Sequence, residues 1–313
     1  MTLVLSAVCP AWVVQCSDRL VTIANRKRTH DPLANKTVIY RATDAVVTIG
    51  FAGLAYVGDQ PTDEWLAELL WGEPISRGPD GVRAVDYRFG QSPNRWNIGL
   101  AAIRIADAIK SSVTRVQPLH VTIAGWRWKR RRPHPILVSV CKESNSRSVR
   151  TERIPRHLPR GTNLRFNAIG VPIERGGLSS RFDRFRERDA LYAEDAEGVF
   201  ARFIRDLSAE NPAVGVDVLS VALFKPGPGS GGVCLFRTNQ TLSARIETPT
   251  RTIDFQGVAH TPWIVSSKFL AAPRAIIGRE TFDLDGYSLD VVGGAPGGGW
   301  LAMSTSLLRP PPP

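Results

Sequence analysis

The chain has 313 residues, of which 43% are apolar, so it can bury a substantial core. This composition excludes wholesale disorder, and the lack of any run of about 18 uncharged apolar residues predicts no membrane span. The net charge is +11, and residues 127–188 account for all of it with 17 basic against 5 acidic side chains.

The cysteines and histidines are not spaced as metal ligands are. The four cysteines form no metal-binding pair, and the five histidines form no HxxH pattern. The apolar start of the chain has no basic leading segment, so it is interpreted as a β-strand and not as a signal peptide. We therefore expect a cytoplasmic protein with small buried thiols and no metal.

The first fifty residues predict two β-hairpins. Apolar runs at 3–8 and 12–17 are separated by a proline-containing turn, and runs at 37–41 and 45–51 form a second pair. The first two runs are apolar on both faces. Both faces of this hairpin should therefore be covered, as in a sheet between two other layers.

Helices and further strands follow in turn. A helix is expected after Pro61, because Asp63 and Glu64 lie in its first turn and apolar residues follow at helical spacing. The spacing of apolar residues predicts the other elements. These are helices at 98–111 and 193–207 and strands at 120–124, 135–141, 164–169 and 216–224. Because consecutive strands pair by hairpins and do not alternate with helices, the pattern favours an α+β fold.

The composition changes after Lys225, where glycine and proline dominate the sequence as far as Gly232. Short β-like runs separated by Pro and Gly follow, and the chain ends in four prolines. We expect a main domain at 1–225 and a β-containing, Pro/Gly-rich C-terminal extension at 226–313.

Several N-terminal residues stand at intervals known from one family. Thr2 is followed sixteen residues later by Asp18 and four residues after that by Thr22, while Lys36 opens the third predicted strand. The fourth predicted strand runs into Gly50-Phe-Ala-Gly53. This pattern resembles the β-subunits of proteasomes and their bacterial relatives, the HslV peptidase and the ancestral β-subunit-like proteins.

The resemblance implies a four-layer αββα Ntn-hydrolase sandwich and a threonine hydrolase that cleaves amide bonds, most readily in peptides. Thr2 would be the nucleophile once Met1 is removed, with Asp18 as orienting carboxylate, Lys36 as pKa modulator and Gly53 as oxyanion donor. Thr22 and Gly53 would bind the substrate as an added strand. The resemblance implies no cofactor, and it makes a homo-oligomer an expectation.

The residue types suit this chemistry. A terminal threonine carries a hydroxyl and an α-amine whose reference pKa is about 7.7–8.0, so one residue supplies both nucleophile and base. A lysine ammonium nearby favours the developing anion. If that lysine is buried it needs a carboxylate, and Asp18 is the candidate because its strand pairs with the strand that starts after Thr2.

Two alternatives remain beside the enzyme. The family's serine after a glycine is absent, because Gly170 is followed by Val171, and this favours a non-catalytic Ntn-type scaffold. The basic run at 127–132, with an interleaved tryptophan, is the pattern of a nucleic-acid patch. We favour a solvated hairpin tip for this run, while the wider basic segment at 127–188 suits acidic partners or a subunit contact.

Overall fold

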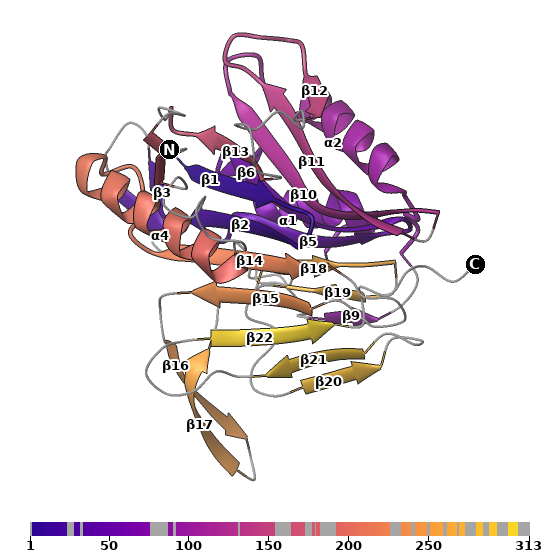
Figure 1. Cartoon of the computed structure of the whole chain (residues 1–313), viewed down its shortest axis with the longest axis vertical. Helices are drawn as coiled ribbons and strands as arrows, with labels where there is room; N and C mark the ends of the chain where they lie inside the picture. The colour runs from indigo at the N-terminus through magenta and orange to yellow at the C-terminus, as the bar shows by residue number, and fades with distance from the viewer. Residues whose placement is uncertain are drawn as a thin grey trace.

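The protein is described by a computed structural model (Figure 1). The described residues are 2–23, 28–31, 34–75, 87–89, 92–130, 132–153, 164–172, 177–178, 180–181, 192–225, 233–238, 242–248, 251–258, 262–267, 269–272, 280–283, 288–292 and 300–305.

Two large sheets form the body of the molecule. The first has the order β13 (Arg165–Gly170), β1 (Leu3–Val8), β2 (Trp12–Asp18), β14 (Val218–Phe224), β15 (Val233–Thr238), β22 (Trp300–Thr305), β21 (Ser288–Val292) and β20 (Glu280–Asp283). The second has the order β12 (Arg150–Arg153), β11 (Arg132–Lys142), β10 (Leu119–Lys129), β6 (Ala45–Ala52), β5 (Thr37–Ala42), β18 (Trp263–Val265), β19 (Phe269–Ala271) and β9 (Tyr87–Phe89).

Three small hairpins complete the described strands. They are β3 (Val21–Ile23) with β4 (Arg28–Asp31), β7 (Tyr56–Val57) with β8 (Gln60–Pro61), and β16 (Leu242–Thr248) with β17 (Arg251–Val258). The fold is therefore α+β, as the sequence predicts.

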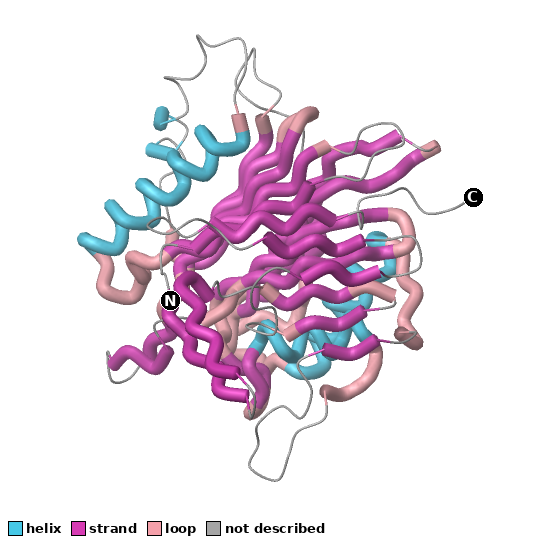
Figure 2. Tube along the Cα trace, turned by 90° about the horizontal axis from the view of Figure 1, so that it is seen from below, coloured by secondary structure: helices cyan, strands magenta, loops and turns pink. Residues whose placement is uncertain are grey.

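Helices cover the two sheets (Figure 2). Helix α4 (Ala193–Glu210) packs on β2 and β14 of the first sheet, and α1 (Thr62–Trp71) and α2 (Ile98–Ser112) pack on the second. Strands β1 and β2 in turn contact β6 and β10 of the facing sheet. Every residue of β1 and β2 is consequently buried, as expected for strands that are apolar on both faces.

Polar side chains of β2 and β6 help to join the two sheets. Gln15 donates a hydrogen bond to Ser6 Oγ at 3.0 Å and accepts one from Thr48 Oγ1 at 2.7 Å. Gly50 leaves room for this amide, because a Cβ there would lie 2.8 Å from Gln15 Oε1. Satisfied polar groups in an otherwise apolar interface fix how one sheet sits on the other.

The predicted elements of the first 225 residues are found with small shifts in their ends. Strands β10 and β11 differ most, because they run on to Lys129 and from Arg132 where a loop was expected at 127–132. The hairpin tip is thus shorter than predicted. The expectation of buried thiols is correct for Cys16, whereas Cys9 and Cys141 are only partly buried.

The strands after residue 232 do not pair only with one another. Strand β15 pairs with β14 in the first sheet, and β18 runs parallel to β5 in the second. The β-rich character of this segment matches the expectation, while the domain boundary at residue 225 stays a prediction. No described helix is long and apolar enough to cross a membrane.

Candidate active site

The candidate site forms where β1 begins and β2 ends. Antiparallel pairing sets Val4 opposite Ser17, so Leu3 lies beside Asp18 and Thr2 emerges at the same end of the hairpin. Asp18 is fully buried, whereas Thr2 is partly exposed. The sequence interval between Thr2 and Asp18 is therefore the interval that returns the hairpin to its starting end.

The Asp18 carboxylate is held by one cation and three backbone amides. Its Oδ2 lies 2.9 Å from Lys36 Nζ, 3.0 Å from the Gly215 amide and 3.3 Å from the Leu20 amide. Its Oδ1 accepts a hydrogen bond from the Leu3 amide at 2.7 Å. The buried negative charge is thus matched by donors on several sides, which a buried carboxylate requires.

Lys36 completes a buried ion pair. Its side chain is 1% exposed, and its ammonium also donates to the Leu20 carbonyl at 2.6 Å. The Lys36 carbonyl accepts a hydrogen bond from the Phe51 amide at 3.2 Å, which ties the start of β5 to the end of β6. The predicted pairing of Lys36 with Asp18 is present, and its role in catalysis stays a prediction.

The backbone of Thr2 is fixed from the opposite side by β13. The Thr2 carbonyl accepts a hydrogen bond from the Val171 amide at 3.1 Å. Gly170 has φ of 105°, and a Cβ there would lie 1.7 Å from the Thr2 carbonyl oxygen. Glycine is therefore required at this position both for its backbone angle and for the close approach of the two chains.

Gly53 follows the last residue of β6. It is exposed and has φ of 113°, and a Cβ on it would lie 2.4 Å from the Pro118 carbonyl oxygen. The preceding Ala52 packs with Val4 and Ile169 in a small buried cluster. A Cβ on Gly170 would lie 3.1 Å from the Ala52 Cβ as well as against the Thr2 carbonyl, so Thr2 and the residue before Gly53 both adjoin the end of β13.

Thr22 lies on β3, where it is paired with Thr29 of β4. The Thr22 side chain lies outside the described part of the structure. The expectation that Thr22 binds substrate stays a prediction.

Sequence reasoning missed the backbone groups that complete the site. Gly215 lies in the segment between α4 and β14, and a Cβ there would lie 2.7 Å from Leu20 Cβ. The close approach lets the Gly215 amide reach Asp18. Gly215 itself was the only feature of the sequence that indicated this contact. Every residue except proline has a backbone N–H donor, so the sequence does not show which donors bind Asp18.

Two residues of the basic hairpin, Arg127 and Trp128, are engaged with the protein, whereas Lys129, Arg130 and Arg132 are exposed. Arg41 stacks over the Trp128 ring at 4.8 Å, and Arg127 Nε lies 2.7 Å from Asp44 Oδ2. Trp128 is 8% exposed, so its ring offers little surface for stacking with a base. No group of three or more His, Cys, Asp or Glu in the described part of the chain could hold a metal ion.

Comparison with known proteins finds distant structural likenesses. No family model and no curated protein matches the sequence. Among solved structures, Anbu from Hyphomicrobium sp. strain MC1 is 17% identical over 71% of this chain and 81% of its own, with a TM-score of 0.45. Its Gly-1 mutant is 16% identical with the same coverage and TM-score.

Anbu, described as an ancestral β-subunit, from Yersinia bercovieri is 11% identical over 72% of this chain and 81% of its own, also with a TM-score of 0.45. At this degree of likeness the comparisons assign neither a family nor an activity to the chain.

Proposed function

We propose that this chain is an N-terminal threonine hydrolase that cleaves amide bonds, most readily in peptides, after removal of Met1. One observation carries the proposal: Asp18 and Lys36 form a fully buried ion pair, and Asp18 accepts a hydrogen bond from the amide of Leu3, the residue next to Thr2. A buried ion pair contributes little net stability compared with apolar residues of the same volume. Its place beside Thr2 is thus better explained by chemistry than by folding.

The reaction begins when the Thr2 Oγ attacks the scissile carbonyl carbon and its proton passes to the Thr2 α-amine, directly or through one water. The resulting oxyanion accepts a hydrogen bond from the Gly53 amide, and such a donor contributes about 2.7–4 kcal/mol to the transition state. The Lys36 ammonium, held by Asp18, favours the negative charge that develops near Thr2.

Collapse of the intermediate breaks the C–N bond, and the α-ammonium returns its proton to the leaving amine. The acyl group is then an ester of Thr2. A water molecule, deprotonated by the same α-amine, hydrolyses this ester and restores the free threonine. In this scheme Asp18 orients Lys36, while Thr22 and Gly53 bind the substrate as an added strand.

The finer description of the fold belongs to the same proposal. We assign the arrangement of α4, the two facing sheets, and α1 with α2 to the four-layer αββα sandwich of Ntn hydrolases. A homo-oligomer and a cytoplasmic location stay predictions of the sequence.

The first test is the mass of the N-terminal peptide, followed by labelling with a peptide epoxyketone, which reacts with a free threonine hydroxyl and amine. We expect a chain that starts at Thr2 and gains one equivalent of the reagent. Thr2→Ala should abolish the labelling, whereas Thr43→Ala, at an exposed turn, should leave it unchanged. Retention of Met1 on the purified protein, or equal labelling of Thr2→Ala, would contradict the proposal.

A non-catalytic scaffold is the second candidate, and one observation favours it. Val171, the residue after Gly170, is buried in the apolar cluster beneath α4, so no hydroxyl occupies that position. This scaffold would bind partners without turnover. It predicts a chain that keeps Met1 or fails to react with the epoxyketone while it remains folded.

A further inference from the structure

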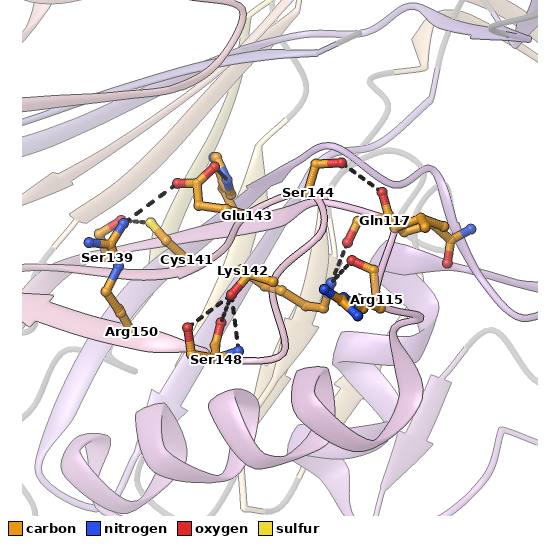
Figure 3. A network of polar contacts seen from close by, with 12 residues as sticks. Arg115, Gln117, Ser139, Cys141, Lys142, Glu143, Ser144, Ser148 and Arg150 are labelled. Carbon is orange, nitrogen blue, oxygen red and sulfur yellow. Dashed lines mark hydrogen bonds and ion pairs between the residues drawn. The ribbon is translucent and has the colours of Figure 1, made fainter.

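Lys142, the last residue of β11, places a buried ammonium outside the site described above. Its side chain is 2% exposed, and Nζ donates to the carbonyls of Thr114 at 2.8 Å, Arg115 at 3.1 Å and Gln117 at 2.7 Å (Figure 3). An ammonium has three N–H donors, so all of them are used. The side chain therefore acts as a fixed cation enclosed by one turn of the backbone.

The enclosed turn joins α2 to β10 and is clamped from a second side. Arg115 Nε donates to the Asn145 carbonyl at 3.2 Å, and Ser144 Oγ donates to the Val116 carbonyl at 2.9 Å. Movement of the turn would leave the buried ammonium of Lys142 without partners, which costs far more than the loss of an exposed hydrogen bond. The turn is consequently fixed relative to the end of β11.

This turn supports Gly53. Gln117 is followed by Pro118 and Leu119. A Cβ on Gly53 would lie 2.4 Å from the Pro118 carbonyl oxygen and 3.3 Å from the Leu119 Cα. Leu119 is also the register partner of Lys142. A short path of direct contacts thus leads from the ammonium, through the turn, to the backbone of Gly53.

We propose that Lys142 is a positioning residue that holds the Gly53 amide where the oxyanion forms, by fixing the turn at 114–118. The inference rests on the proposed function, in which Gly53 is the oxyanion donor. Loss of one oxyanion donor lowers kcat by about 10²–10³-fold. Because such a donor acts on the transition state, its misplacement lowers kcat, and because Gly53 also contacts the substrate, KM rises by a smaller factor than kcat falls.

The test compares Lys142→Met with Lys110→Met, which removes an exposed ammonium from α2. We expect Lys142→Met to lower kcat for a peptide substrate by about tenfold or more, with a smaller rise in KM relative to the unsubstituted protein. Hydrogen exchange should accelerate in peptides covering residues 113–119 and 51–57. Lys110→Met should change neither measurement.

A milder variant keeps the proposal testable if Lys142→Met does not fold. Ser144→Ala removes an exposed hydroxyl that holds the same turn, so exchange at 113–119 should rise and exchange at 51–57 should rise with it. Faster exchange at 113–119 with unchanged exchange at 51–57 would overturn the proposal, because the turn would then move without Gly53.

The exchange measurement separates this inference from the proposed function. If the unsubstituted protein shows no Thr2-dependent turnover, the hydrolase proposal fails, and coupled exchange of the two peptides still decides whether Lys142 positions Gly53. If turnover is present and Lys142→Met retains the full kcat, the positioning role is wrong although the hydrolase proposal stands.

Discussion

The ion pair of Asp18 and Lys36 makes a prediction about stability that does not depend on catalysis. Lys36→Met leaves a buried carboxylate without its cation, so we expect the free energy of unfolding to fall by about 3–5 kcal/mol. The double variant Asp18→Asn with Lys36→Met should lose less than the sum of the two single variants, because no uncompensated charge remains. Urea unfolding of the four proteins measures this coupling.

An exposed ion pair provides the comparison. Arg181 and Asp206 form a pair whose side chains are 38% and 59% exposed. Arg181→Met should change the free energy of unfolding by no more than about 1 kcal/mol. If Arg181→Met and Lys36→Met lowered the free energy of unfolding equally, solvent and not the protein would be what stabilises the Asp18 charge.

The family resemblance pointed to Asp18 and Lys36, and the chemistry of a buried lysine predicted that they pair, but neither predicted the surroundings of the pair. A buried lysine needs a carboxylate, and the pairing of the first two strands brought Asp18 to the required end of the sheet. The amides of Leu3, Leu20 and Gly215 were invisible, because their positions depend on how the segment before β14 returns to the hairpin. The hydrogen bonds between Lys142 and the turn at 114–118, which is distant from it only in sequence, were missed for the same reason.

The end of β13 determines where Thr2 lies, and this leads to a prediction about Gly170. An alanine there would place its Cβ 1.7 Å from the Thr2 carbonyl oxygen, so one of the two strands must shift. We expect Gly170→Ala to lose epoxyketone labelling and to lower the midpoint of thermal unfolding. Both are measured on the same purified protein.

Gly58 is the matched control, because it also has a positive φ, of 62°, but a Cβ there would meet nothing within 4 Å. Gly58→Ala should show only the backbone penalty of roughly 1 kcal/mol and retain labelling. Loss of labelling in both variants would mean that backbone strain in general, and not contact with Thr2, accounts for the effect.

Local patterns predicted most of these elements because each has a face that must be apolar. Helix α2 was predicted at 98–111 and runs from Ile98 to Ser112, since its buried residues recur at helical spacing. The tip of β10 and β11 was predicted less well because arginine and lysine usually indicate a loop. Here the Arg41 guanidinium instead stacks over the Trp128 ring and the Arg127 guanidinium pairs with Asp44, which stabilises the longer ladder.

The arrangement of the whole chain depends on contacts that no local pattern contains. The C-terminal segment contributes β18 beside β5, and Trp263 Nε1 donates to Asp63 Oδ2 at 3.0 Å across 200 residues of sequence. Trp263 is 1% exposed and belongs to the core beneath α1. The expectation of a C-terminal extension rests on composition, because short strands separated by glycine and proline give no sign of their partners.

The contact between Asp63 and the C-terminal segment predicts how stability changes with pH. Desolvation raises the pKa of Asp63 from 3.8 to about 6, although hydrogen bonds from Asn35 and Trp263 favour its ionised form, and the nearby charge of Glu64 adds to the rise. The folded protein therefore binds this proton more tightly than the unfolded chain does. The contribution of Asp63 is greatest below about pH 4 and is lost as the pH rises to about 6.

We expect Asp63→Asn to remove this dependence, because its amide does not titrate. The difference in free energy of unfolding between the unsubstituted protein and Asp63→Asn should shift by up to about 3 kcal/mol in favour of the variant between pH 4 and pH 6. Urea unfolding at intervals across this range measures the shift. Thr43→Ala, which removes no titrating group from an exposed turn, should give a constant difference. A constant difference for Asp63→Asn as well would mean that water reaches this carboxylate, and that the C-terminal segment does not shield it.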